Sequence, residues 1–164
     1  MIPLESILEI YLHPNEFYWG DSETRIKTVL GSCIAICMWH PKLKIGGMSH
    51  SLLPTRFEPS VKVGNLDGRY VDEAVQLFLF EVLKAKTKPE DYKVKVFGGA
   101  AVLATNNTEQ TIGSRNYEMS QKSLKEAGFT IFSEHTGGNE ARNVMLDLWS
   151  GETWLRRIQT NEKN

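Results

Sequence analysis

Two cysteines and one histidine are the residues of this sequence best suited to covalent chemistry. Cys33 and Cys37 lie in the apolar stretch 26–39, and His50 follows in the segment GGMSHSLLP. A thiol within reach of an imidazole can attack a carbonyl group, because the imidazole takes up the thiol proton and later delivers a proton to the leaving amine. Either cysteine could instead be a small, buried and inert side chain, which is the usual state of a free cysteine.

The two segments are predicted to form a β-hairpin that brings Cys33 close to His50. Residues 26–39 are rich in β-branched and apolar side chains, residues 44–53 form a second such run, and His40-Pro41-Lys42 supplies a turn between them. In a hairpin about this turn, residues whose numbers add up to about 82 or 83 lie opposite each other. His50 is therefore expected opposite Cys33 or one of its neighbours.

Strand periodicity separates the roles of the two cysteines. Alternate residues of a strand share a face, and the distance from Cys33 to Cys37 along an extended strand is roughly 13 Å. The two thiols therefore cannot form a disulfide and are poorly spaced to share a metal ion. Cys37 is predicted to pack in the core, and the sequence contains no metal or cofactor signature.

Cys33 differs from Cys37 because Gly31 and Ser32 precede it at the start of the apolar run. Backbone N–H groups that are not committed to a strand ladder can form an anion-binding nest. We therefore expect the backbone at Gly31 and Ser32 to supply an oxyanion hole beside the Cys33 thiol. The further glycines at 46, 47, 98 and 99 are expected to allow the close approach of a substrate to the backbone.

The predicted helices and strands indicate one α/β or α+β domain over residues 1–164. Apolar spacing predicts helices over residues 69–86 and 114–127, and strands over 92–97, 129–133, 144–149 and 153–158. Residues 1–25 show no clear period, and a short strand or helix followed by an irregular segment is expected there. Strands that precede and follow the helices favour a β-sandwich flanked by helices, and a dinucleotide-binding fold is excluded because no GxGxxG motif occurs.

Composition names no partner. A net charge of -1, 41% hydrophobic and 24% charged residues give no bias toward nucleic acid or an acidic membrane surface. The apolar-rich run 74–83 is shorter than the roughly 20 residues of a membrane span, so membrane insertion is not expected. Two cysteines are too few for a disulfide-stapled secreted scaffold, which predicts a cytoplasmic protein.

Several segments, in a consistent order, carry a resemblance to a known family. The segments TVLGSC, GGMSHSLLP, RYVDEA, VFGGA, IGSRN and HTGGNEAR resemble those of the CheD chemoreceptor glutamine deamidases. This resemblance implies a bacterial chemotaxis enzyme that converts receptor glutamines to glutamate without a cofactor. It also implies a fold similar to the catalytic domain of cytotoxic-necrotizing-factor toxins, which is a β-sandwich flanked by helices.

The resemblance also assigns roles to residues. It implies that Cys33 is the nucleophile, that His50 is the base and that Thr28, before the LGSC motif, is the third catalytic residue. Ala141 stands where the late GGN segment of the family has glycine, and a positive φ there would strain the backbone. The implied partners are the cytoplasmic domain of a methyl-accepting chemoreceptor, as substrate, and a CheC-type phosphatase.

Two other functions are compatible with the same residues. A non-catalytic adaptor that binds chemoreceptors or the CheC-type phosphatase would need neither Cys33 nor His50 for chemistry. A cysteine peptidase or a transglutaminase-like acyltransferase would use the same thiol with a different leaving group or acceptor. Ammonia release without chain cleavage or cross-linking separates a deamidase from the latter two.

Overall fold

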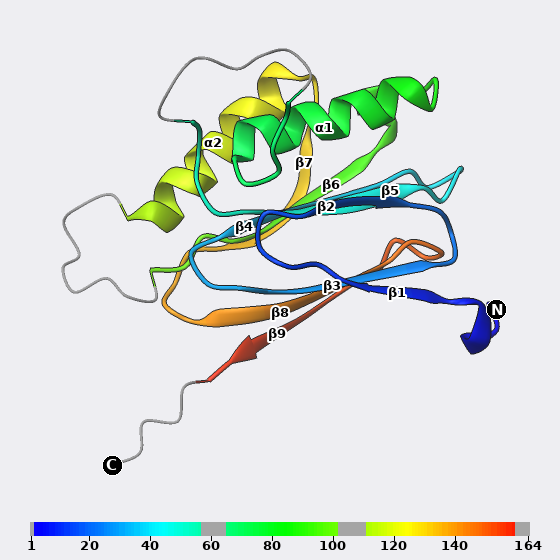
Figure 1. Cartoon of the computed structure of the whole chain (residues 1–164), viewed down its shortest axis with the longest axis horizontal. Helices are drawn as coiled ribbons and strands as arrows, with labels where there is room; N and C mark the ends of the chain where they lie inside the picture. Colours follow the sequence, from blue (N-terminus) through cyan, green and yellow to red (C-terminus); the bar gives the residue numbers. More distant parts are fainter. Residues whose placement is uncertain (1, 57–64, 102–110, 160–164) are drawn as a thin grey trace.

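The structure is a computed structural model, and it describes residues 2–56, 65–101 and 111–159. Figure 1 shows three layers, with two helices above a five-stranded sheet and a four-stranded sheet below it. The elements in chain order are η1 (Leu4–Ser6), β1 (Leu8–Tyr11), β2 (Phe17–Gly20), β3 (Thr24–Leu30), β4 (Ile34–Trp39), β5 (Gly46–Ser51), α1 (Val71–Lys84), η2 (Pro89–Asp91), β6 (Lys93–Gly98), α2 (Ile112–Glu126), β7 (Ile131–Thr136), β8 (Ala141–Asp147) and β9 (Thr153–Ile158).

The five-stranded sheet is the middle layer and is covered on both faces. Its strand order is β2-β5-β4-β6-β7, with β6 and β7 parallel and the other neighbours antiparallel. The central strand β4 reads IAICMW, a continuous apolar run, because side chains on both of its faces are buried. This sheet therefore forms the centre of the molecule.

The four-stranded sheet has one buried and one open face. Its order is β1-β3-β8-β9, and β3 (TRIKTVL) alternates between buried residues and residues that are less buried or exposed. Such alternation is typical of a strand with one face on the core and one on solvent. The side chains of Ile26, Thr28 and Leu30 consequently point toward the middle sheet.

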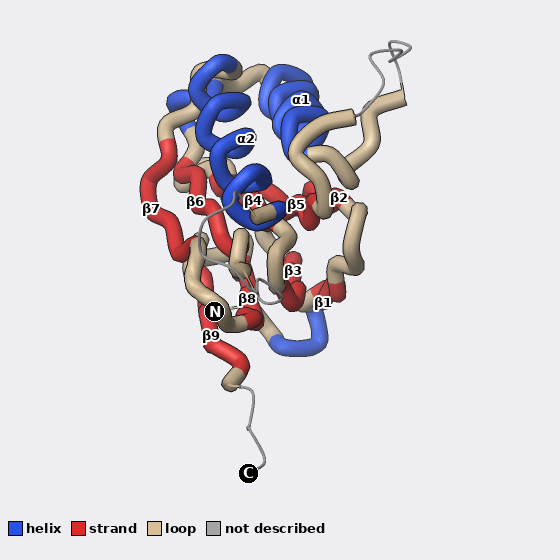
Figure 2. Tube along the Cα trace, turned by 90° about the vertical axis from the view of Figure 1, so that its left-hand side faces the viewer, coloured by secondary structure: helices blue, strands red, loops and turns tan. Residues whose placement is uncertain are grey.

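Two apolar clusters join the layers. Residues of β4, β6, α1 and α2 form the cluster between the helices and the middle sheet, with Ile34, Ile36, Met38, Phe78, Val94 and Leu124 among its members. The cluster between the two sheets includes Ile26, Ala35, Cys37, Met48, Val144 and Leu146. Figure 2 shows α1 and α2 next to each other over the middle sheet. A fully buried side chain such as Phe78 contributes about 2–3 kcal/mol to stability.

Most of the predicted elements are confirmed. The structure has the α+β sandwich with helices packed outside, the helices expected over 69–86 and 114–127, and a terminal antiparallel hairpin of β8 and β9. The alternation predicted for β4 is also confirmed, because Ala35 and Cys37 face one cluster while Ile36 faces the other. None of the described helices has the length and apolar character needed to cross a lipid bilayer.

One expectation was wrong and another was incomplete. Residues 26–39 are not one strand, because the chain bends at residues 31–33 and passes from β3 in one sheet to β4 in the other. Residues 1–25 contain the expected short strand, β1, but a second short strand, β2, follows it, and each lies on the edge of a sheet. Short edge strands receive part of their stability from pairing with a neighbour, so their own sequence carries a weak signal.

Candidate active site

Cys33 lies at the corner where the chain crosses between the two sheets. The bend at residues 31–33 ends just before β4 begins at Ile34. Cys33 is half-buried, whereas Cys37 is 2% exposed in the middle of β4. Both are free cysteines, as the strand spacing predicted. The corner location leaves the Cys33 backbone outside the strand ladder.

The carbonyl groups of this corner are held by the segment that follows β6. The N–H of Ala100 donates to Gly31 O at 3.0 Å, and the N–H of Gly99 donates to Cys33 O at 2.9 Å. Among the described residues, the N–H groups of Ser32 and Cys33 have no backbone acceptor. These two groups are therefore available to an incoming anion, which is the arrangement expected of an oxyanion hole.

Gly98 makes the close contact between β6 and the corner possible. Its φ is 106°, and a Cβ atom placed on it would lie 2.1 Å from Cys33 O. An L-residue is excluded there by both its backbone conformation and its side chain. The glycines at 98 and 99 thus accommodate the protein's own backbone.

The glycines of β5 also serve the fold. A Cβ on Gly46 would lie 2.0 Å from Met38 O, and one on Gly47 would lie 2.2 Å from Tyr18 O. The expectation that these glycines make room for a substrate is therefore wrong. They allow neighbouring strands to approach β5 closely.

His50 lies in β5 and is 2% exposed. Its backbone N–H donates to Glu16 O at 3.0 Å, and its carbonyl accepts from the N–H of Asn15 at 2.8 Å. His50 pairs with Ala35, so the expected pairing with Cys33 or a direct neighbour is wrong. The turn is longer than predicted, because His40 N–H bonds Ile45 O at 2.8 Å and β5 begins only at Gly46.

The register still places His50 and Cys33 on the same side of the middle sheet. Directly paired residues share a face, so the His50 ring and the Ala35 side chain both point toward the four-stranded sheet. Cys33 packs against the same inter-sheet cluster as Ala35. No hydrogen bond joins the Cys33 sulfur to His50 in the part of the chain that the structure describes. Catalytic contacts of this kind often tighten only when substrate is bound.

Thr28 reaches the His50 ring from the opposite sheet. Its Oγ1 lies 2.6 Å from His50 Nδ1 and 2.7 Å from Leu12 O. A hydroxyl has one proton, and the Leu12 carbonyl can only accept, so Thr28 donates to Leu12 and accepts from Nδ1–H. The proton of a neutral His50 is therefore on Nδ1, and Nε2 keeps its lone pair.

Burial sets the charge of both groups at rest. Burial lowers the pKa of His50 to about 4, while the Glu16 carboxylate opposes this shift and His13 adds to it. Burial also raises the pKa of the Cys33 thiol, and its own backbone N–H acts in the opposite direction as the smaller effect. At neutral pH the site therefore holds a neutral thiol and a neutral imidazole.

Cys37 has no comparable surroundings. Burial raises the pKa of its thiol to about 12, and Lys95 lowers it to a smaller extent. It packs in the inter-sheet cluster beside Met48, with which it is paired in the β4–β5 ladder. A protonated, buried thiol is inert.

Sequence reasoning missed two buried polar residues at the site. Arg142 is 3% exposed and donates from Nη1 to Gly98 O at 2.8 Å and to His135 O at 2.6 Å, and from Nη2 to Gly137 O. It therefore supports the glycine segment below the Cys33 corner. The second residue, Asn116 of α2, donates to Ser32 O at 3.1 Å and to Leu52 O at 2.9 Å. No spacing rule links either residue to Cys33, because the contacts join elements far apart in sequence.

The strain expected at Ala141 does not occur. Ala141 begins β8, and positive φ values in this segment fall on Gly137 (78°) and Gly138 (70°). Alanine is therefore compatible with its position.

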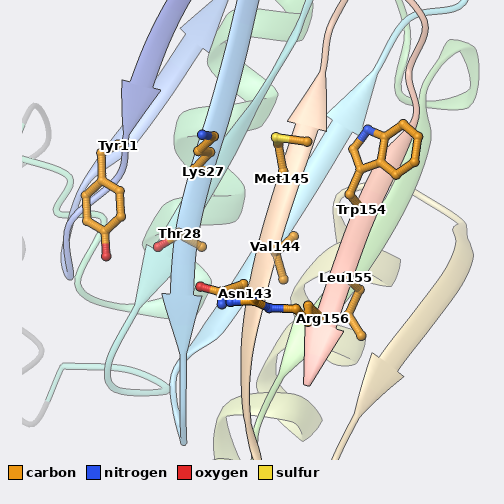
Figure 3. Close-up of a pocket in the computed structure, with 9 residues that line it drawn as sticks. All are labelled: Tyr11, Lys27, Thr28, Asn143, Val144, Met145, Trp154, Leu155 and Arg156. Carbon is orange, nitrogen blue, oxygen red and sulfur yellow. The ribbon is translucent and has the colours of Figure 1, made fainter. Parts of the chain in front are cut away.

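A separate pocket of about 530 Å³ lies on the four-stranded sheet (Figure 3). It spans β1, β3, β8 and β9 and is lined by residues that include Tyr11, Lys27, Asn143, Met145, Trp154 and Arg156. Thr28 contributes to its wall, but the Thr28 hydroxyl bonds His50, which lies in the other sheet. The pocket does not include Cys33 or His50.

Comparisons with known proteins identify the family to which this chain is similar. The sequence profile of the family described as CheD chemotactic sensory transduction matches residues 52–157. A probable chemoreceptor glutamine deamidase, CheD 3 of Dechloromonas aromatica, is 43% identical over 90% of this chain and 86% of its own length. Proteins with the same description are 37% identical in Chromobacterium violaceum (93% of this chain, 79% of the relative) and 36% identical in Leptospira interrogans (93% and 95%).

Proposed function

This chain belongs to the CheD family, and on that premise we propose that it deamidates glutamine side chains of chemoreceptors with Cys33 as its nucleophile. The observation that carries the proposal is the hydrogen-bond chain from Leu12 O through the Thr28 hydroxyl to His50 Nδ1. This chain leaves Nε2 as a proton acceptor on the side of the sheet that Cys33 shares. The relatives' descriptions supply the substrate class.

The first step is proton transfer coupled to nucleophilic attack. His50 Nε2 takes the proton of the Cys33 thiol while the sulfur forms a bond to the carboxamide carbon of a receptor glutamine. The π electrons of the carbonyl move to its oxygen, and the N–H groups of Ser32 and Cys33 stabilise the resulting oxyanion. Because both side chains are neutral at rest, no thiolate needs to exist before substrate arrives.

The next steps release ammonia and then glutamate. The oxyanion collapses, the C–N bond breaks, and the imidazolium gives its proton to the leaving amide nitrogen, so that ammonia leaves and a thioester remains. His50 then deprotonates a water molecule, which attacks the thioester. When the C–S bond breaks, the imidazolium returns the proton to the Cys33 sulfur and the product is a glutamate side chain.

Thr28 has an orienting part in this scheme. It accepts from Nδ1–H in both the neutral and the protonated imidazole, so the ring keeps one orientation through the cycle. A third group that holds the base in one tautomer is the usual logic of a catalytic triad.

The test compares the two cysteines. Cys33→Ala is expected to lower ammonia release from a purified chemoreceptor cytoplasmic domain by at least about 1,000-fold, because the nucleophile is lost. Cys37→Ala, the matched control, is expected to keep most of the activity. Mass spectrometry of the receptor fragment checks for the conversion of glutamine to glutamate. Full activity of the Cys33→Ala chain would contradict the proposal and favour another nucleophile.

The proposal includes a cytoplasmic site of action and, through the resemblance, a CheC-type phosphatase as partner. An adaptor that acted only by docking would keep its effect on receptor signalling when Cys33 is replaced. Binding of the purified phosphatase to the Cys33→Ala chain, measured by calorimetry, separates docking from catalysis. A chain that neither deamidates the receptor nor binds the phosphatase would contradict both parts.

A further inference from the structure

Asn116 is a buried amide that touches both segments of the candidate active site. It lies in the second turn of α2 with no exposed surface. Its Nδ2 donates to Ser32 O at 3.1 Å and to Leu52 O at 2.9 Å. Ser32 immediately precedes Cys33, and Leu52 follows the end of β5, the strand that carries His50. Both partners are carbonyl acceptors, so the amide can lie only with its NH2 group toward them.

The other end of this amide has no partner. Asn116 Oδ1 is buried and accepts no hydrogen bond among the described residues. A buried acceptor left without a donor costs about 1–3 kcal/mol, and native structures contain few of them. The two donated hydrogen bonds therefore fix the orientation of the amide.

The bond to Ser32 fixes the direction of the Cys33 N–H. The Ser32 carbonyl and the Cys33 N–H belong to the same planar peptide, and in a trans peptide they point in opposite directions. No cis peptide occurs among the described residues. Asn116 therefore holds the Ser32 carbonyl toward α2 and turns the Cys33 N–H away from it. That N–H acts on its own side chain, because it lowers the pKa of the Cys33 thiol.

The fold brings α2 close enough to make these bonds. A Cβ on Gly113 would lie 2.5 Å from Gly99 O and 2.6 Å from Ala100 O, so only glycine permits this approach of the first helical turn. Thr111 caps the helix by accepting from the N–H of Ser114 at 3.1 Å. The first turn of α2 is thereby fixed against the segment that also holds Gly31 and Cys33.

We propose that Asn116 is a positioning residue that aims the Cys33 N–H at the oxyanion and holds the end of β5 against the Cys33 corner. This inference rests on the proposed function of Cys33 as a nucleophile at a carbonyl carbon. It assigns Asn116 no contact with substrate. Its effect is exerted through the Ser32–Cys33 peptide and through Leu52.

The test uses two reactions of the same thiol. Acylation of Cys33 by p-nitrophenyl acetate passes through a tetrahedral oxyanion, expels p-nitrophenolate and leaves a thioester. Alkylation by iodoacetamide displaces iodide at a saturated carbon and forms no oxyanion. Both rates are measured in excess reagent at the same pH, so that the thiolate fraction cancels in their ratio, and the rate of Cys33→Ala is subtracted as background.

Asn116→Leu is expected to lower the acylation rate by about 10- to 100-fold, because a misdirected oxyanion donor is largely lost. The alkylation rate is expected to stay close to that of the wild type. In deamidation of the receptor fragment, kcat should fall with little change in KM. Asn116→Ala provides a smaller replacement in case the leucine chain does not fold.

Ser120→Ala is the matched control, because Ser120 is a fully buried residue of the same helix whose hydroxyl, among the described residues, bonds only within α2, to Tyr117 O at 2.6 Å. It should leave both rates unchanged. A ratio of acylation to alkylation that is the same in the Asn116 variants and the wild type overturns the inference. Wild-type chain that is acylated on Cys33 but releases no ammonia from receptor contradicts the proposed substrate instead, so the two failures are distinguishable.

Discussion

The corner that carries Cys33 and the strand interior that carries Cys37 differ in their backbone hydrogen bonding. Cys37 is part of β4, and its backbone pairs with Met48 on one side and Lys95 on the other. Cys33 precedes the ladder, and its N–H has no backbone acceptor among the described residues. The same residue type lies twice on one run of sequence and against one apolar cluster, but only Cys33 lies outside the strand ladder.

On the proposed function, the reactivity of Cys33 comes from an interrupted strand. The Cys37 thiol, in mid-strand, is buried among apolar side chains with its backbone N–H in the strand ladder, and Lys95 offsets only a small part of the cost of a negative charge there. At a corner between two sheets the chain must leave one ladder before it enters the next. The N–H groups released by this crossing are the groups that a tetrahedral oxyanion requires.

The largest expected contrast is in the alkylation of the two thiols. In the native chain, iodoacetamide should modify Cys33 at least about 1,000-fold faster than Cys37, because Cys37 reacts only after the core opens. Peptide mass spectrometry after timed quenching measures both rates in one sample. Comparable rates for the two cysteines would remove the distinction between corner and strand.

The pH dependence of this alkylation tests the charge state of the site. The thiolate is the reacting form, and burial raises the pKa of Cys33, so the rate should keep rising above the pH at which an ordinary thiol is half ionised. A rate that no longer changes with pH near neutrality would show that a thiolate is already formed. This would contradict a neutral Cys33 thiol beside a neutral His50. The Cys37→Ala chain serves as the background for this titration.

A smaller contrast is expected from two glycines that both have positive φ. Gly98→Ala should destabilise the fold by about 3 kcal/mol or more, because its Cβ would overlap Cys33 O and its φ is 106°. Gly137→Ala, with φ 78° and no atom within 4 Å of the added Cβ, should cost only about 1–2 kcal/mol. Urea unfolding of both variants gives the difference. Equal losses would mean that the contact between Gly98 and the corner is not tight.

The two regions also differ in how well sequence alone predicts them. β4 was predicted, together with the faces of its residues, because six successive apolar residues leave little choice of structure. The corner was not predicted. Only Gly31, Ser32 and Cys33 separate β3 from β4, and a break of this length does not alter the hydrophobic pattern. The break is imposed by the tertiary structure, in which β3 pairs with β8 and β4 with β6.

The same limit applies to the residues around the site. Cys33, His50 and Thr28 could be selected from residue type, strand spacing and resemblance. Asn116 and Arg142 end the IGSRN and HTGGNEAR segments of that resemblance, but residue type and spacing give neither of them a role, because their partners are backbone carbonyls supplied by distant segments. A sequence shows which side chains can react, whereas the groups that hold a peptide plane in place become visible only when the contacts are known.

The smallest effect expected concerns the hydroxyl that orients His50. Thr28→Val keeps the shape of the side chain but removes the acceptor for Nδ1–H, so that part of the His50 population places its proton on Nε2 and cannot accept from Cys33. We expect kcat for deamidation to fall about 10-fold with KM unchanged, and Thr28→Ser to restore most of the loss.

Thr24→Val is the matched control, because Thr24 lies on the same inward face of β3, is also 2% exposed, and bonds Asp21 in place of a histidine. If the Thr28→Val chain were fully active, Thr28 would not be needed to keep Nε2 of His50 unprotonated. The difference in reactivity between the two cysteines would then come from the backbone at residues 31–33 alone. If it loses activity while Thr24→Val does not, reactivity at Cys33 requires contributions from both sheets: a released peptide N–H at the corner, and from β3 a hydroxyl that fixes the base.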